Sequence, residues 1–358
     1  MTYPVLRVHL DVMEGNIRSI VSKCKEHGIS VWAVTKGLSA PTELACRIET
    51  TGVTALADSR IMNIRRMRKA GIKAPLALIR IPMRSELEDV IDLADYSLVS
   101  DIGTLAEMSK ICESKRKEHK VLLMTDMGDL REGFWPDEAG DVAEGIKKLS
   151  PALKIVGIGV NFGCASGVLP SGESLGRFVA FGEEIESSLG RKLDIFSGGA
   201  TTRSLIAIDG GLFPPRVNNL RIGEGYLLGT DKSSGVIVPW LRQDTMEIEA
   251  ELVEVRRKPT LPIGEVGRDA FGNVPVFKDR GRRLRGILAI GKQDVSISGL
   301  KPLDEGVEII TASSDHLLVD LEDCKARPKV GDILRFRPDY PGMLSSSTSP
   351  YVTKIFVG

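Results

Sequence analysis

The first two thirds of the chain alternate between short runs of β-branched residues and longer segments with helical spacing. This alternation limits the possible folds more than any other feature. Eight such runs lie at residues 31–35, 54–57, 76–81, 96–99, 121–125, 155–160, 193–196 and 219–222. Strand–helix repeats favour a parallel sheet. Eight of them over about 230 residues match a (β/α)8 barrel, so we predict this fold.

The residues that follow the predicted strands are candidate site residues, because barrel enzymes place their active sites at the carboxyl ends of the strands. Lys36 follows the first run directly. A lone ammonium there either reaches solvent or has its pKa lowered by burial for chemistry. Lysines of the second kind form Schiff bases with carbonyl compounds. Asn161 and Ser197, which follow the sixth and seventh runs, are further candidate binding residues.

A turn with two glycines and two hydroxyl residues follows the seventh run, in the segment Ser-Gly-Gly-Ala-Thr-Thr at residues 197–202. Free backbone N–H groups and hydroxyl donors at such a turn suit a phosphate group. Barrel phosphate sites recur after strands seven and eight. The alternative for Thr201 and Thr202 is a simple turn with a helix cap.

The composition argues against several classes of partner and ligand. The 48 basic and 48 acidic residues cancel, which gives no support for nucleic acid or an anionic membrane as the main partner. Charged residues interrupt every long apolar run, the N-terminal one included, so we expect no membrane span and no signal peptide, and a cytoplasmic location. The five cysteines are scattered and the histidines lack metal-ligand spacing, so we expect reduced thiols and no bound metal.

The pattern changes near residue 231, where helical spacing gives way to short alternating strands punctuated by glycine and proline. The expected strands cover residues 246–255, 284–290, 307–311, 317–321, 333–337 and 351–356. We therefore predict two domains, a barrel over residues 12–230 and a mainly antiparallel β domain over residues 231–358.

The order of these features resembles the fold-type III pyridoxal-phosphate enzymes, the alanine racemase superfamily. Within it, the segments Asn-Asn-Leu-Arg-Ile-Gly-Glu at 218–224 and Ala-Ser-Ser-Asp-His at 312–316 are most similar to the ornithine racemase branch. The positions that match the superfamily are Lys36, the Asp-Met-Gly-Asp-Leu-Arg-Glu-Gly segment at 126–133, Thr201, Thr202 and the Arg-Ile-Gly segment at 221–223.

This resemblance implies an enzyme that racemises a free amino acid, ornithine or another basic one, with pyridoxal 5'-phosphate as cofactor. It implies that Lys36 carries the cofactor and moves the α-proton on one face. The phosphate-binding hydroxyls would be those of Thr201 and Thr202, with Ile222 and Gly223 as further cofactor-binding residues.

Arg221 would face the pyridine nitrogen of the cofactor in the resembled family. A guanidinium that does not deprotonate keeps that nitrogen unprotonated, which favours racemisation over transamination. The alternative is an ion pair between Arg221 and Glu224. Arg131 would meet the substrate carboxylate or the cofactor phenolate, since a planar donor suits an anion. Its alternative is a salt bridge to Asp126 or Glu132.

The base on the opposite face of the substrate is the open question. Alanine racemase has a tyrosine in a Gly-Tyr-Ala-Asp-Gly segment, where this chain has Gly-Lys-Gln-Asp-Val at 291–295. Lys292 at that position, Asp315 and His316 are the candidates, because each can carry a proton. Asp315 is also a candidate for binding the terminal ammonium of a basic substrate, as is Glu224. The alternative for Asp315 and His316 is a surface turn.

The resemblance also implies a head-to-tail homodimer, in which the β domain closes the barrel mouth of a second subunit and the sites are composite. The N-terminal strand within residues 1–11 would add to the β domain. Three other functions stay open: an alanine or broad-specificity racemase, a lyase or aldolase of the same fold, and a non-catalytic carrier or regulator. A carrier needs neither the β domain nor an arginine at the ring, and a lyase or aldolase would need a divalent metal.

Overall fold

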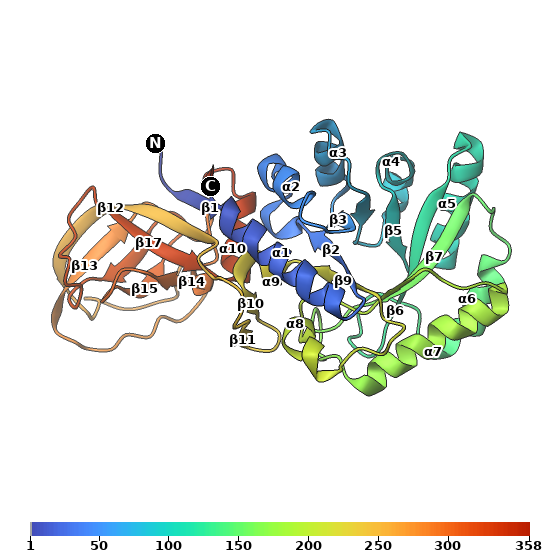
Figure 1. Ribbon diagram of the computed structural model, residues 1–358. Coiled ribbons are helices and arrows are strands. Elements are labelled where there is room, and N and C mark those ends of the chain that lie inside the picture. The colour runs from blue at the N-terminus through green and yellow to red at the C-terminus, as the bar shows by residue number, and fades with distance from the viewer. Residues whose placement is uncertain (1) are drawn as a thin grey trace. The chain divides into compact units, whose positions relative to one another are not determined.

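The structure, a computed structural model, describes residues 2–358 and divides into two compact units (Figure 1). The barrel unit is Leu10–Gln243, and the β unit combines residues 2–9 with Asp244–Gly358. The N-terminal strand therefore belongs to the same unit as the C-terminal third of the chain.

The barrel unit contains a closed barrel of eight parallel strands, as the sequence predicts. Its closure pairs the last strand with the first, from Ser30 opposite Asn219 to Ala33 opposite Ile222. The strands are β2 (Ser30–Val34), β3 (Ala55–Asp58), β4 (Leu76–Leu78), β5 (Tyr96–Val99), β6 (His119–Thr125), β7 (Leu153–Val160), β8 (Ile195–Ser197) and β9 (Asn219–Ile222). The largest difference from expectation is at β4, which ends at Leu78 rather than at residue 81. Beyond it, Arg80 forms an ion pair of 2.6 Å with Glu86.

The centre of the barrel is filled by alternate residues of its strands, as the period of two requires. Trp32 is the largest of them, and the small side chains of Ala55, Ala57 and Ala77 leave room for it. Leu122 and Met124 of β6 lie in the same cluster. The interior is therefore a packed core and not a channel.

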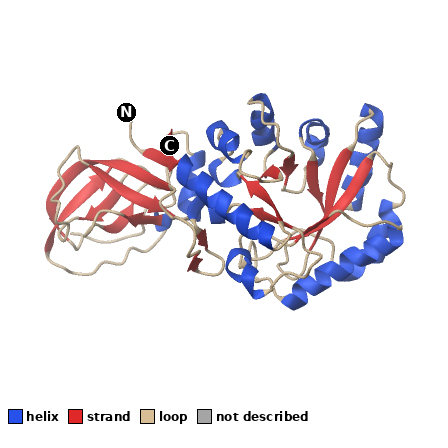
Figure 2. Cartoon of the chain, viewed as in Figure 1, coloured by secondary structure: helices blue, strands red, loops and turns tan. Residues whose placement is uncertain are grey.

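Helices surround the strands of the barrel unit (Figure 2). The first, α1 (Leu10–Glu26), buries one apolar face that includes Met13, Ile17 and Ile20. The others are α2 (Thr42–Ile48), α3 (Ile61–Lys69), α4 (Leu87–Leu93), α5 (Ile102–Lys115), α6 (Ala139–Ile146), α7 (Gly172–Leu189), α8 (Ser204–Ala207) and α9 (Glu224–Leu228), with short 3-10 turns η1 (Lys36–Leu38), η2 (Arg84–Glu86), η3 (Pro136–Glu138) and η4 (Ile208–Gly210). Across residues 2–358, every helix is too short or too polar to cross a membrane.

The β unit is built on an eight-stranded sheet that is mainly antiparallel. Its strand β1 (Val5–His9) pairs antiparallel with β12 (Met246–Pro259) and parallel with β18 (Thr353–Val357). The remaining strands are β13 (Arg282–Leu288), β14 (Leu300–Pro302), β15 (Glu308–Ala312), β16 (Leu317–Asp320) and β17 (Ile333–Pro338), with a 3-10 turn η5 (Ile297–Gly299). A small hairpin of β10 (Thr230–Asp231) and β11 (Val236–Ile237) belongs to the barrel unit.

The expectation that helical segments end near residue 231 is wrong at one place. Helix α10 (Tyr340–Thr348) lies just before β18. Asp339 caps its start by accepting a hydrogen bond of 3.1 Å from the N–H of Gly342. The serines donate back to carbonyls one turn earlier, as Ser346 does to Gly342 O at 2.7 Å. A helix this rich in serine has no clear apolar spacing, so the sequence pattern did not reveal it.

His119 makes the stability of the barrel unit dependent on pH. The side chain is 2% exposed, and Nε2 lies 2.9 Å from the Ser97 hydroxyl. Burial lowers the pKa of His119 to about 4, whereas the unfolded chain has an ordinary histidine pKa of about 6.5. The unfolded state therefore binds the proton first, and stability is lost as the pH falls from about 6.5 to about 4.

We expect this loss to be about 3 kcal/mol between neutral pH and pH 4, because the two pKa values differ by roughly 2.5 units. In His119→Gln the contribution disappears, so the stability difference between the variant and the wild type should shrink as the pH falls. Urea unfolding at several pH values, followed by circular dichroism, measures this. A difference that stays constant with pH would contradict it.

Candidate active site

Lys36 lies immediately after β2, at the start of the 3-10 turn η1. Its ammonium has no hydrogen-bond acceptor or ion-pair partner within residues 2–358. Burial lowers the pKa of Lys36, and the Arg131 guanidinium lowers it further. Cys164, Asp58 and Glu132 act in the opposite direction and raise it. The structure therefore gives Lys36 the environment of a reactive amine and not that of a surface lysine.

Arg221 of β9 is 2% exposed and lies among acceptors from two neighbouring strands. Its Nη1 donates to the Ser197 hydroxyl, and its Nη2 donates to Val160 O and Asn161 Oδ1, both at 2.7 Å. Gly159 makes room for this group, because a Cβ there would lie 3.3 Å from Nη1. Burial lowers the pKa of Arg221 to about 10. These bonds fix the guanidinium plane and leave Nε without an acceptor within residues 2–358.

The ion pair between Arg221 and Glu224, the alternative considered for Arg221, is not formed. Glu224 instead accepts hydrogen bonds of 2.7 Å from the Thr230 hydroxyl and from the N–H of Lys232. Burial raises the pKa of Glu224. Both contacts tie the start of α9 to the hairpin of β10 and β11.

A polar chain links Arg221 to Arg131, which lies in the loop after β6. Glu132 forms a two-pronged ion pair with the Arg131 guanidinium. Asn161 connects the two arginines, since its Nδ2 donates to Glu132 Oε1 at 2.5 Å while its Oδ1 accepts from Arg221. Of the alternatives for Arg131, the salt bridge to Glu132 is present. Asp126 binds the backbone N–H of Arg131, at 2.9 Å, and not its guanidinium.

The Ser197 hydroxyl contacts Arg221 and acts both as an acceptor and as a donor of hydrogen bonds. It accepts from Arg221 and donates to Asn219 Oδ1 at 2.6 Å. The structure thus brings the predicted residues Asn161 and Ser197 together around Arg221, where they hold the guanidinium in place.

Asp129 is a residue that the sequence reasoning missed. Its buried carboxylate accepts four backbone N–H groups of the loop after β7, those of Cys164, Ala165, Ser166 and Val168, at 3.0 to 3.3 Å. This loop carries Cys164 towards Lys36. The signal available in the sequence was an acidic residue inside a glycine-containing turn, a position that commonly binds backbone N–H groups.

The two threonines after β8 have different partners. Thr201 Oγ1 accepts a hydrogen bond of 3.2 Å from the N–H of Gly225, which lies in α9 and not in the helix that follows Thr201 in the chain. Thr202 Oγ1 donates to the hydroxyl of Ser233 at 3.2 Å. Gly163 lies against this pair, since a Cβ there would come within 2.7 Å of Thr202 and 3.0 Å of the Ser233 hydroxyl. Ser233 was also missed, because it lies in the hairpin after β10 and outside any recognisable motif.

Lys292, Asp315 and His316 lie in the β unit, whereas Lys36 lies in the barrel unit. Asp315 and His316 form the turn between β15 and β16, next to the loop that carries Lys292. The two segments are in contact, since Lys292 donates from its backbone N–H to Ser313 O at 3.0 Å. Asp315 accepts from the Gln293 side chain. The structure thus places the three candidates for the second base on two adjacent loops of the β unit.

The side chain of Lys292 points to a loop of its own unit. Its Nζ lies 3.8 Å from Asp269 Oδ2 and 3.7 Å from the centre of the Phe271 ring. The remaining predicted residues, Ile222 and Gly223, end β9 and precede α9.

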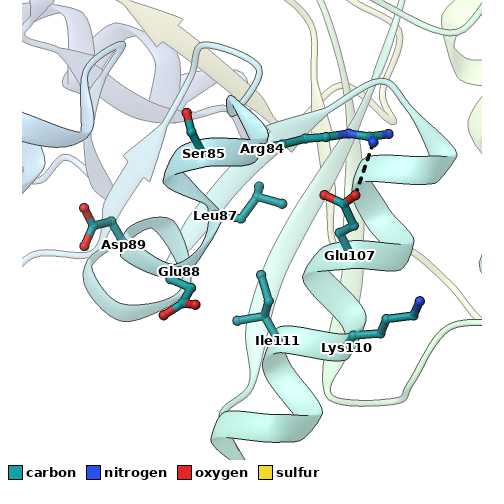
Figure 3. Close-up of a pocket in the computed structure, with 8 residues that line it drawn as sticks. All are labelled: Arg84, Ser85, Leu87, Glu88, Asp89, Glu107, Lys110 and Ile111. Atoms are coloured by element: carbon teal, nitrogen blue, oxygen red, sulfur yellow. Dashed lines mark ion pairs between the residues drawn. The ribbon is translucent and has the colours of Figure 1, made fainter.

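A hollow of about 540 Å³ lies apart from all of these residues, on the outside of the barrel unit between α4 and α5 (Figure 3). Arg84 and Glu107 form an ion pair of 3.2 Å at one end of it. The side chains of Leu87, from α4, and Ile111, from α5, line it between the two helices (Figure 3). Within residues 2–358, no three His, Cys, Asp or Glu side chains are grouped so that they hold a metal ion.

Asp129→Ala should release the loop after β7, because four backbone N–H groups lose a charged acceptor. We expect amide hydrogen exchange in residues 164–168 to become about 30-fold faster, which corresponds to about 2 kcal/mol. Exchange followed by mass spectrometry measures this. Asp129→Asn keeps one acceptor oxygen and should lie between the two. Unchanged exchange in Asp129→Ala would show that the loop is held by other contacts.

Comparison with known proteins identifies the family. Residues 8–228 match the family described as "Alanine racemase, N-terminal domain". The lysine racemase of Thermotoga maritima is 40% identical over 99% of this chain and 99% of its own length. The ornithine racemase of Acetoanaerobium sticklandii is 39% identical over 98% of this chain and 99% of its own.

Solved structures agree with this at the level of the fold. The alanine racemase from Streptomyces lavendulae superposes with a TM-score of 0.78 at 15% identity, covering 100% of this chain and 98% of that one. The alanine racemase from Bartonella henselae with covalently bound pyridoxal phosphate gives 0.77 at 15% identity, covering 100% of both chains. The resemblance carried by the sequence motifs is confirmed, and the chain belongs to the alanine racemase family.

Proposed function

We propose that this protein racemises a basic free amino acid, lysine or ornithine, with pyridoxal 5'-phosphate as its cofactor. The observation that carries the proposal is similarity over nearly the whole chain to a lysine racemase and an ornithine racemase. The two substrates share a second amino group at the end of an unbranched side chain and differ by one methylene. A pocket discriminates one methylene by only about 1 to 3 kcal/mol, so both belong in the proposal.

The described residues fit a cofactor that carries an aldehyde, a ring nitrogen and a phosphate. Within residues 2–358 the Lys36 amine has no hydrogen-bond or ion-pair partner, and its pKa is lowered, which suits attachment to an aldehyde. Arg221 offers Nε to a ring nitrogen. The hydroxyls of Thr202 and Ser233, packed against Gly163, are donors for a phosphate. A side chain at residue 163 would press into this pair of hydroxyls, so glycine keeps it open.

The cofactor, when bound, supplies the electron sink that makes the α-hydrogen of an amino acid acidic enough to leave. Lys36 then holds and returns the proton at Nζ on one face. Burial favours its neutral form, so the amine is available as a base near neutral pH. Arg221 would hold its positive charge towards the bound cofactor, because its bonds to Val160 and Asn161 fix the guanidinium.

The roles of the other barrel residues follow from their contacts. Arg131, still partly exposed beside Glu132, is the proposed contact for the substrate carboxylate or the cofactor phenolate. Thr201 anchors the start of α9, next to Ile222 and Gly223, which we propose contact the cofactor.

We further propose that the second base comes from the β unit of a second subunit, in a head-to-tail homodimer with composite sites. Asp315, His316 and Lys292 are the candidates, and Asp315 or Glu224 is proposed to bind the terminal ammonium. Their support is that Lys292 and the turn at Asp315 lie side by side in one unit. We also place the protein in the cytoplasm, because its cysteines are free thiols.

Lys36→Ala should abolish racemisation, because it removes both the attachment point and one base. We expect activity on lysine and ornithine to fall about a thousandfold or more. Chiral chromatography and solvent deuterium entry at Cα, over a panel of amino acids, measure this in the wild type and the variant. Borohydride reduction followed by peptide mass analysis should place the cofactor on Lys36. A wild-type protein that exchanges no amino acid on the panel would refute the proposed function.

The proposed homodimer is tested at an apolar loop of the β unit, between β12 and β13. Ile263 and Val276 are each 94% exposed there, and Phe271 and Phe277 are exposed as well. Exposed apolar residues gathered in one loop are typical of a contact surface. Ile263→Ser should raise the dissociation constant of the dimer by about tenfold. Met62, 65% exposed on α3, gives the matched control Met62→Ser.

Sedimentation equilibrium measures both variants against the wild type. Because Ile263 makes few contacts in its own chain, Ile263→Ser should unfold at the same temperature as the wild type. A monomeric wild-type protein, or a dimer that Ile263→Ser leaves unchanged, would count against this contact surface.

A further inference from the structure

Asp58 ends β3 and is fully buried, yet no cation within residues 2–358 forms an ion pair with it. Its carboxylate has three hydrogen-bond donors: the Thr35 hydroxyl at 2.7 Å, the N–H of Arg60 at 2.9 Å and the Asn63 side chain at 3.0 Å. None of these groups is charged. Burial of a charged carboxylate is strongly destabilising unless a cation lies near it.

Lys36 is the cation whose charge acts on Asp58, and the sheet register brings the two strand ends together. Strands β2 and β3 are parallel neighbours, with Val34 opposite Ala57. Thr35 and Asp58 are therefore opposite each other one step further on, and Thr35 also donates its backbone N–H to Ala57 O at 2.9 Å. Lys36 is the next residue of the chain. Its ammonium lacks an acceptor within residues 2–358, just as Asp58 lacks a cation.

We propose that Asp58 is a positioning residue for Lys36, whose ammonium it balances as a counter-charge across the carboxyl ends of β2 and β3. The role rests on the proposed function, in which Lys36 takes up and returns a proton at Nζ. Asp58 acts through Lys36 and does not touch the substrate. The Thr35 hydroxyl keeps the carboxylate aligned with the strand that carries Lys36.

The charged and titratable groups that face Lys36 come from three strand ends. Asp58 is the last residue of β3, Arg131 and Glu132 lie in the loop after β6, and Cys164 lies in the loop after β7. Burial raises the pKa of Asp58, and the hydrogen bonds from Thr35, Asn63 and the backbone of Arg60, followed by the charge of Lys36, oppose that rise in part. The effect is mutual, since Asp58 raises the pKa of Lys36 against the effect of burial. Glu132 is already paired with Arg131, which leaves Asp58 as the carboxylate without another cation.

A purely structural role for Asp58 is the competing explanation, because its bonds to Arg60 and Asn63 also hold the start of α3. The two roles make different predictions for a neutral isostere. Asn at residue 58 keeps an acceptor oxygen for α3 but removes the charge that Lys36 experiences.

The experiment measures the reactivity of Lys36 towards trace acetic anhydride as a function of pH, in the full chain with the cofactor removed. Mass spectrometry of the peptide that contains Lys36 gives the extent of labelling. In Asp58→Asn the labelling profile should move to lower pH, so that below the wild-type midpoint Lys36 reacts about tenfold faster than in the wild type. A profile that coincides with the wild type would overturn the proposal.

Asp101→Asn is the matched control, because Asp101 also follows a barrel strand and accepts from a threonine hydroxyl and a backbone N–H, at 2.7 and 2.6 Å. Its labelling profile at Lys36 should coincide with that of the wild type. Asp58→Ser is a second neutral variant for the same measurement if Asp58→Asn does not yield folded protein. In the cofactor-loaded enzyme, Asp58→Asn should shift the acid limb of the kcat profile and leave KM nearly unchanged.

The labelling measurement separates this inference from the proposed function. A shifted profile in a protein that racemises no amino acid would refute the proposed function and leave the pairing of Asp58 with Lys36 standing. Racemase activity together with an unshifted labelling profile would support the proposed function and refute the pairing of Asp58 with Lys36.

Discussion

The closure of the barrel between β9 and β2 is the constraint on which the site depends. Pairing Trp32 with Arg221 in this register places the Lys36 end of β2 beside the Arg221 end of β9. The ends of two strands that are separated by most of the barrel sequence thereby lie side by side. A shift of the register by one residue would turn Arg221 to the other side of the sheet and remove it from Ser197 and Asn161. The hydrogen bond from Tyr226 to Val34 O, 3.0 Å long, joins the same two segments again just beyond the strands.

Closure of the barrel brings the cations Lys36, Arg131 and Arg221 to the carboxyl ends of its strands, where they are poorly solvated. Carboxylates and amides in the loops compensate for this. Arg131 is neutralised by Glu132, and the Asn161 side chain connects that pair to Arg221. Within residues 2–358, Arg221 is held by neutral acceptors, so no carboxylate neutralises its charge directly. Lys36 has no direct partner in the described part of the chain, residues 2–358, which keeps its amine free to react. The three cations therefore differ in their surroundings: Arg131 is paired with a carboxylate, Arg221 is fixed by neutral acceptors, and Lys36 is left free.

The sequence predicted the barrel because each strand run and each helical segment was strong enough to be recognised on its own. Lys36, Arg221 and Arg131 could be chosen as candidates because they follow strand ends or lie in recognisable motifs. Asp58 and Asp129 could not, because their roles come from contacts between loops or strands that only the closed barrel creates. Ser233 was missed for the same reason, since it reaches Thr202 across 31 residues of chain. Helix α10 was missed because its serines bond to their own backbone and hide the apolar spacing.

Recognition of a second substrate amino group requires a carboxylate that can accept one more donor. Both candidates already have hydrogen bonds within their own unit: Glu224 from Thr230 and the backbone at residue 232, and Asp315 from Gln293 and Ser314. A carboxylate has about four lone-pair directions, so two bonds do not exhaust it. They do fix its orientation, and a carboxylate held in place loses less side-chain entropy when an ammonium binds. A substrate with a neutral side chain, such as alanine, would leave this carboxylate without its ammonium partner. Lysine and ornithine both supply that ammonium and differ by one methylene. A fixed carboxylate therefore selects a basic amino acid over alanine more strongly than it separates lysine from ornithine.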